Sequence, residues 1–87
     1  MISVTAGNDS TYRVTVDEGS TRTVHDVTVT PEDVARYAPG TAAPHLVKAS
    51  FEFLLEREPK EAILSRFDLP TIERYFPDYP ATIRGLL

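Results

Sequence analysis

The first third of the chain alternates apolar and polar residues. Every second position is apolar along three stretches: Ile2 and Val4, then Tyr12, Val14 and Val16, then Val27 and Val29. This period of two is typical of strands that bury one face. Residues 7–10 and 17–20 separate the stretches and are rich in Gly, Asn, Asp and Ser, the residue types that favour turns. The pattern predicts a three-stranded antiparallel meander over residues 1–30.

The third stretch contains an irregularity. Val24 is out of phase with Val27 and Val29. One extra residue at His25 or Asp26 would bulge the strand and restore the phase. In the alternative interpretation the strand is regular and Val24 faces the other side of the sheet.

Residues 30–33 have the composition of a helix start. Thr30 offers a hydroxyl to free backbone amides, Pro31 suits the first helical position, and the two acids that follow favour the positive end of the helix dipole. Pro39 and Gly40 end the segment soon afterwards. We expect a short helix.

Residues 44–57 show the strongest helical pattern. Its apolar positions cover most of the circumference, and only Lys48, Glu52 and Glu56 form a polar stripe at four-residue spacing. This helix is predicted to be central and to be covered on more than one side. The side chains expected to be buried are Val47, Phe51, Leu54 and Leu55.

After Pro59, apolar residues recur at helical spacing in three short segments: Ile63, Leu64 and Phe67; Ile72, Tyr75 and Phe76; Ile83, Leu86 and Leu87. Each is predicted to be a helix of one or two turns. The expected fold class is α+β, with an N-terminal three-stranded antiparallel meander packed against one long and several short helices. Residues 1–87 are expected to form a single domain, with the meander at 1–30 and the helical part at 31–87.

Composition narrows the class of protein. The 87 residues are 41% hydrophobic and 25% charged, the ordinary mixture of a globular domain. The net charge is −4, and the nine basic residues are scattered among thirteen acidic ones, so no nucleic-acid binding is expected of the single chain. Cysteine is absent, and neither a signal peptide nor a membrane span is recognisable. These features predict a cytoplasmic protein that does not bind membranes.

A resemblance adds little about activity. The run 50–59 (SFEFLLEREP), followed by Ile63-Leu64, Phe67-Asp68-Leu69, Ile72 and Arg74-Tyr75-Phe76-Pro77, resembles a family of short bacterial proteins that are functionally uncharacterised. The likeness covers roughly half of the chain. It implies a free-standing bacterial domain, and no activity, cofactor or site follows from it.

Residues that could carry catalysis are few. His25, Asp26 and His45 are the imidazoles and nearby carboxylate from which a metal or acid–base site could be built, but no motif spacing links them. The four glycines are too dispersed for a phosphate-binding loop. We therefore predict no catalytic, metal-binding or cofactor-binding residues, and a protein that is not an enzyme.

Two sequence features bear on binding partners. Residues 62–76 resemble a helix-turn-helix in outline, but the turn lacks glycine and the second helix has one arginine for one acid. The aromatic run 75–80 offers Tyr75 and Tyr79 as candidate partner-binding residues, whereas Phe76 is expected in the core. In a domain with only eight aromatic residues, core packing is the commoner role for such a run.

Three functions stay open. The leading hypothesis is a non-enzymatic protein-interaction module, which would bind another protein or a second copy of itself through a sheet edge or the aromatic end of the helical part. The second is a DNA-associated, antitoxin-like regulator that acts as an oligomer. The third is an accessory subunit of an enzyme.

Overall fold

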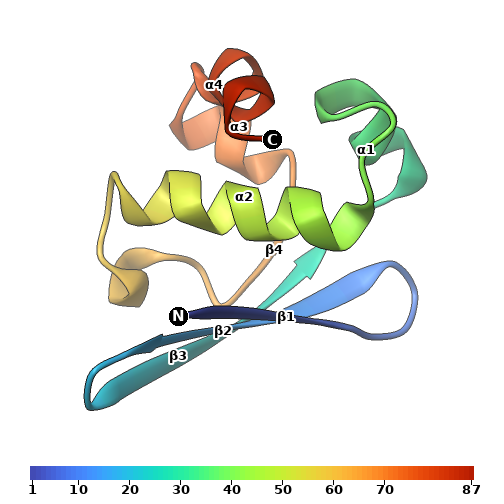
Figure 1. The fold of residues 1–87 in the computed structure, drawn as a ribbon. Coiled ribbons are helices and arrows are strands. Elements are labelled where there is room, and N and C mark those ends of the chain that lie inside the picture. Colours follow the sequence, from blue (N-terminus) through green and yellow to red (C-terminus); the bar gives the residue numbers. More distant parts are fainter.

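A computed structural model describes residues 1–87 as two layers, a four-stranded sheet with helices on one face (Figure 1). The elements along the chain are β1 (Ile2–Ala6), β2 (Thr11–Glu18), β3 (Thr21–Thr28), α1 (Pro31–Tyr37), α2 (Ala43–Leu55), the 3-10 helix η1 (Lys60–Ala62), β4 (Arg66–Asp68), α3 (Thr71–Tyr75) and α4 (Tyr79–Leu86). The strand order in the sheet is β1-β2-β3-β4. The α+β class predicted from the sequence is confirmed.

The first three strands form the predicted antiparallel meander, and β3 has no bulge. Its register against β2 is continuous, with Val14 opposite His25 and Val16 opposite Thr23. The predicted bulge at His25 or Asp26 is wrong, and Val24 faces outward with 46% of its surface exposed. The regular register is tolerated because His25, which takes the core-facing position, has hydrogen-bond partners for both ring nitrogens.

The fourth strand was not expected. β4 pairs with β3 in parallel, with Phe67 opposite Val27, and makes the sheet mixed. The helix predicted over residues 63–67 is therefore wrong. The strand forms because the edge of β3 has backbone groups to satisfy: Asp26 N–H donates to Ser65 O at 2.8 Å, and Leu69 N–H donates to Thr28 O at 3.0 Å.

The start of α1 follows its sequence signature. Thr30 Oγ1 accepts a hydrogen bond from the Asp33 N–H at 3.1 Å, and Asp33 Oδ2 accepts one from the Thr30 N–H at 3.0 Å. This reciprocal pair is a capping box. Beyond the helix, Gly40 adopts a φ of +83°, a conformation that side chains disfavour.

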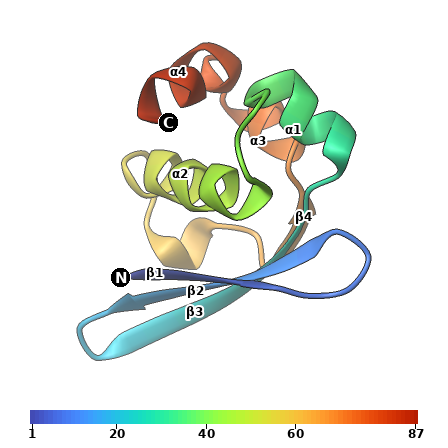
Figure 2. The same cartoon turned by 45° about the vertical axis from the view of Figure 1, so that its right-hand side comes forward.

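The long helix α2 lies between the sheet and the other helices, as Figure 2 shows. Lys48 and Glu52 are exposed and Phe51 is fully buried, as predicted, whereas Leu55 is only half-buried. Leu55 packs against the core without belonging to it, whereas its neighbour Leu54 is buried. The predicted short helices near 72–76 and 83–87 are present as α3 and α4.

One hydrophobic core joins the two layers. It contains 18 buried residues: Val14, Val16, Val27, Val29, Tyr37, Ala38, Leu46, Val47, Ala49, Phe51, Phe53, Leu54, Ile63, Phe67, Leu69, Ile72, Tyr79 and Ile83. None of the helices combines the length and the apolarity that crossing a membrane would require.

Candidate functional site

The two tyrosines proposed for partner binding have opposite environments. Tyr75 is 67% exposed on α3, whereas Tyr79 is completely buried at the start of α4. The Tyr79 ring lies with its centroid 5.1 Å from that of Tyr37 and 5.2 Å from that of Phe53. Because Tyr79 has no exposed surface, only Tyr75 of the two candidate residues is available to a partner without unfolding.

Tyr79 is buried because its hydroxyl has a partner inside the core. Ser50 Oγ donates its hydrogen to Leu46 O at 2.7 Å and is therefore the acceptor for the Tyr79 hydroxyl at 2.6 Å. Burial raises the pKa of Tyr79 above its ordinary value. Tyr79 therefore contributes to the stability of the core, and a partner would contact other residues.

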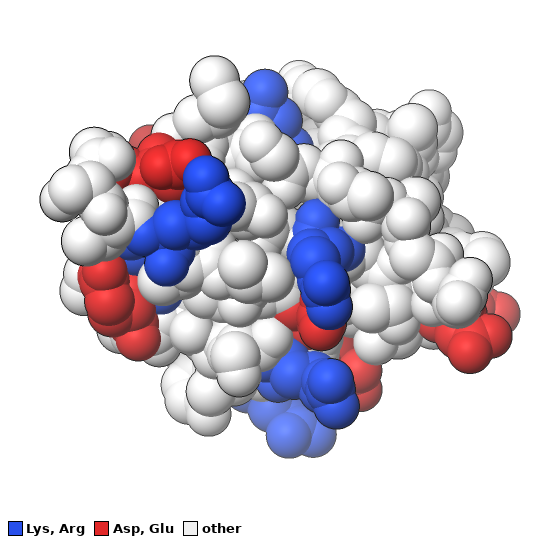
Figure 3. Space-filling view, turned by 90° about the horizontal axis from the view of Figure 1, so that it is seen from below, with Lys and Arg blue, Asp and Glu red and all other residues white.

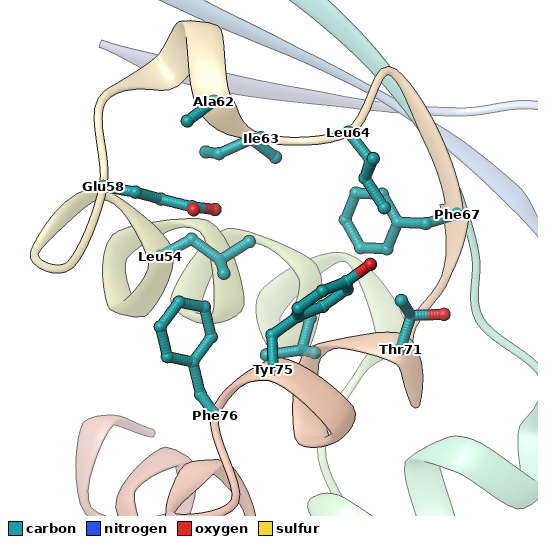
Figure 4. Close-up of a pocket in the computed structure, with 10 residues that line it drawn as sticks. Leu54, Glu58, Ala62, Ile63, Leu64, Phe67, Thr71, Tyr75 and Phe76 are labelled. Carbon is teal, nitrogen blue, oxygen red and sulfur yellow. The ribbon is translucent and has the colours of Figure 1, made fainter.

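Tyr75 borders an open apolar groove between α3 and the segment 58–67. The groove has a volume of about 430 Å³. Eight of its ten lining residues are hydrophobic, and the complete set is Leu54, Glu58, Ala62, Ile63, Leu64, Phe67, Thr71, Ile72, Tyr75 and Phe76 (Figure 4). We call this feature the α3 groove.

The wall formed by residues 58–64 is tied to the sheet at two places. His25 lies on the core side of β3, and its Nδ1 lies 2.8 Å from Leu64 O, to which it donates. Lys60 Nζ pairs with Glu61 at 2.9 Å and with Glu18 of the β2–β3 hairpin at 3.3 Å. The hydrogen bond to Glu61 is the main reason why the pKa of Lys60 is raised. These contacts fix the position of the wall relative to the sheet.

The opposite wall is fixed by the end of α2. The ring of Phe76 meets Phe53 edge to face, with centroids 5.8 Å apart. The Arg57 guanidinium lies 3.6 Å above the Phe53 ring and donates to Asp78 Oδ2 at 2.9 Å. The hydrogen bond from Arg57 lowers the pKa of Asp78 below its ordinary value. Phe76 was expected inside the core, but it is half-buried because one side of it lines the groove.

Polar groups lie on two sides of the groove. Figure 4 shows the Glu58 carboxylate beside Leu54, and the Tyr75 hydroxyl directed toward the Phe67 ring. Glu58 is half-buried, and no Lys, Arg or His nitrogen lies within 4.0 Å of its carboxylate. The groove therefore offers apolar contact together with one carboxylate that a cation could approach.

Hydrophobic side chains also border the groove mouth. Leu64 is 47% exposed, and together with Tyr75 it presents apolar surface beside the opening. Sequence reasoning identified Tyr75 but missed Glu58, Leu64 and Thr71. The helix wrongly expected over 63–67 placed Leu64 on the same buried face as Phe67 and so concealed the groove.

The titratable residues considered for chemistry are not brought together. His25 faces the core, whereas Asp26 faces outward and pairs with Arg13 at 3.0 Å, which lowers the pKa of Asp26. His45 is exposed on α2, a different element. No group of three or more His, Cys, Asp or Glu side chains is arranged to hold a metal ion.

Comparison with protein-family models, with curated proteins and with solved structures gave no match. The resemblance to a family of short bacterial proteins therefore stays a prediction. A functional assignment for this chain rests on the geometry of the α3 groove and its surroundings.

Proposed function

We propose that the protein is a non-enzymatic interaction module and that the α3 groove receives an apolar segment of a protein partner. The observation that carries the proposal is the exposure of Leu64 and Tyr75 beside a groove of about 430 Å³ whose lining is mostly apolar. Large apolar side chains exposed next to one another mark interaction surfaces, and tyrosine is among the commonest energetic anchors of interfaces.

The occupant we favour is an amphipathic helix with a lysine or arginine next to its apolar face. Apolar side chains at helical spacing would enter the groove, while Leu64 and Tyr75 would contact the flanks of the helix. A basic residue would supply the ion-pair partner that Glu58 lacks within the chain. A small molecule of drug size would also fit a cavity of this volume, but it would cover Leu64 and Tyr75 only on the sides that line the groove.

A site-specific photo-crosslinker separates this surface from other apolar surface. It is placed at position 64 in one protein and at position 86 in the control, because Leu86 is a 39% exposed leucine outside the groove. Both proteins are expressed in the native cells. We expect the protein with the crosslinker at position 64 to crosslink to one predominant protein, and the protein with the crosslinker at position 86 not to crosslink to it. The same crosslinked species from both positions, or none from position 64, would contradict the proposal.

Binding measurements with the crosslinked partner then test, with single variants, whether the partner contacts the α3 groove. Tyr75→Ala removes a groove-side anchor and should weaken binding by about 2 kcal/mol or more, with little change in thermal stability. Glu58→Lys, as a separate variant, should also weaken binding, and its effect should be largest at low salt. Leu86→Ser is the matched control and should bind like wild type. Equal binding by all four proteins would rule out the α3 groove.

The alternative of a DNA-associated regulator has less support. Figure 3 views the molecule from the sheet side, where basic side chains are interrupted by acidic and uncharged ones. Arg13 pairs with Asp26 at 3.0 Å and Arg22 with Asp17 at 3.1 Å, so the charge of both arginines is already compensated. An accessory subunit of an enzyme would use the same groove as an interaction module, and the identity of the crosslinked partner separates these two functions.

A further inference from the structure

The hydrogen bonds of β1 show which of its backbone groups face outward. In an antiparallel pair, alternate residues bond to the neighbouring strand and the others point away from it. Asp17 N–H donates to Met1 O, and Gly7 N–H donates to Thr11 O, both at 2.8 Å. The odd-numbered residues of β1 therefore bond to β2.

The even-numbered residues Ile2, Val4 and Ala6 point their N–H and C=O groups away from β2. β1 is the first strand in the sheet and has no neighbour on that side. No turn, loop or side chain bonds these outward groups. Their side chains share the helix-covered face of the sheet, where Ile2 and Val4 are half-buried against the core.

This edge lacks the features that protect sheet edges from association. The sequence of β1 is ISVTA, without a charge or a proline, and its pairing with β2 is free of bulges. The opposite edge of the sheet is protected: β4 has only three residues, and Arg66 and Asp68 in it are charged and exposed. The β1 edge is therefore open to pairing with a further strand, whereas the β4 edge is protected from it.

We propose that β1 pairs with β1 of a second copy of this chain, antiparallel and about a two-fold axis at Val4. Val4 then exchanges both main-chain hydrogen bonds with Val4 of the other copy, and Ile2 exchanges both with Ala6 of the other copy. This register uses every outward group of the strand. The result is one continuous sheet across the two molecules.

The side chains at this seam are compatible with the same register. On the helix-covered face, the larger Ile2 lies beside the small Ala6 of the other copy, and the half-buried apolar layer continues through the two Val4 side chains. On the outer face, Ser3 lies opposite Thr5 of the other copy. Because β1 carries no charged side chain, pairing with itself brings no like charges together within the strand. No residue of β1 lines the α3 groove.

Sedimentation equilibrium of the purified chain is the first test. The wild type should show a concentration-dependent mass rising to twice that of the chain. Val4→Pro removes an outward N–H and no bond to β2, and it should weaken self-association by at least about tenfold. Ser3→Lys combined with Thr5→Lys, which opposes like charges across the seam, should do the same. Thr15→Lys is on the same face but on β2, and it should dimerise normally.

Disulfide formation tests the register, because the chain has no cysteine of its own. Ser3 and Thr5 of the other copy form a closely spaced, non-hydrogen-bonded pair in this arrangement. A mixture of Ser3→Cys and Thr5→Cys proteins should therefore crosslink at least about tenfold faster than either protein alone. A wild type that stays monomeric, a dimer that survives both β1 variants, or equal crosslinking by the single proteins would overturn the proposal.

Discussion

Ser50 is a polar residue on an otherwise apolar, fully buried part of α2. Its hydroxyl donates to the carbonyl of Leu46 one turn earlier and accepts from the Tyr79 hydroxyl at 2.6 Å. Each oxygen thus has a partner, and no buried side-chain nitrogen or oxygen in the protein lacks one. A single hydroxyl in α2 therefore allows a tyrosine from α4 to enter the core.

Tyr79→Phe should reduce the free energy of unfolding by about 1 kcal/mol, the usual net value of one hydrogen bond. Ser50 keeps its bond to Leu46 O in this variant, so no buried donor is left unpaired. Tyr75→Phe, the matched control, should change stability by less than about 0.5 kcal/mol because the ring is exposed. Urea unfolding gives both values, and equal losses would contradict the assignment of Tyr79 to the core.

At the scale of elements, α1 and α3 are joined through Glu73. Glu73 Oε1 accepts a hydrogen bond from the Tyr37 hydroxyl at 2.8 Å and another from Arg36 Nη2 at 2.9 Å. Burial, followed by this hydrogen bond to a carboxylate, raises the pKa of Tyr37 to about 12. If Tyr37 ionised, its phenolate would repel the Glu73 carboxylate and could no longer donate the hydrogen bond. The link therefore requires the neutral phenol.

This link predicts a loss of stability at alkaline pH. The pKa of Tyr37 is higher in the folded than in the unfolded chain, so its contribution is complete below the ordinary value of 10.0 and declines as the pH rises toward about 12. Tyr37→Phe should show a shallower decline over this range in urea unfolding. Part of the slope remains, since burial also raises the pKa of Tyr79. An unchanged slope in Tyr37→Phe would exclude Tyr37 as a cause.

At the scale of the whole molecule, Phe51 connects the two layers. Its ring centroid lies 5.3 Å from that of His25 on β3 and 6.1 Å from that of Phe67 on β4. The same sheet residues hold the wall of the α3 groove, because His25 also bonds Leu64 O. The core that stabilises the fold therefore supports the proposed binding surface as well.

Phe51→Ala should lower the free energy of unfolding by about 3–5 kcal/mol, a large share of the stability of a domain of this size. Because one core joins sheet and helices, far-ultraviolet circular dichroism and tyrosine fluorescence should report the same transition in wild type and variant. Lys48→Ala, on the exposed face of the same helix, should melt like wild type. Separate transitions for the two probes would show that the layers unfold independently.

Local sequence determined the elements whose signals lie close together in the chain. The meander follows from a period of two between turn-forming residues, and α1 follows from Thr30 and Asp33, whose capping bonds span three residues. The exposed stripe at Lys48 and Glu52 follows from helical spacing alone. Such interactions depend on neighbours within a few residues, so the chain specifies them without knowledge of the fold.

Tertiary structure decided the features that depend on distant partners. Residues 66–68 form a strand because β3 presents unpaired backbone groups to them, although their local spacing fits a helix. Tyr79 is buried because Ser50, 29 residues away, accepts a hydrogen bond from its hydroxyl. His25 is buried because Leu64 O, 39 residues away, accepts a hydrogen bond from its ring. Long-range hydrogen bonds also fix the segments that form the α3 groove. For that physical reason Tyr75 could be identified from the sequence, but the groove that it lines could not.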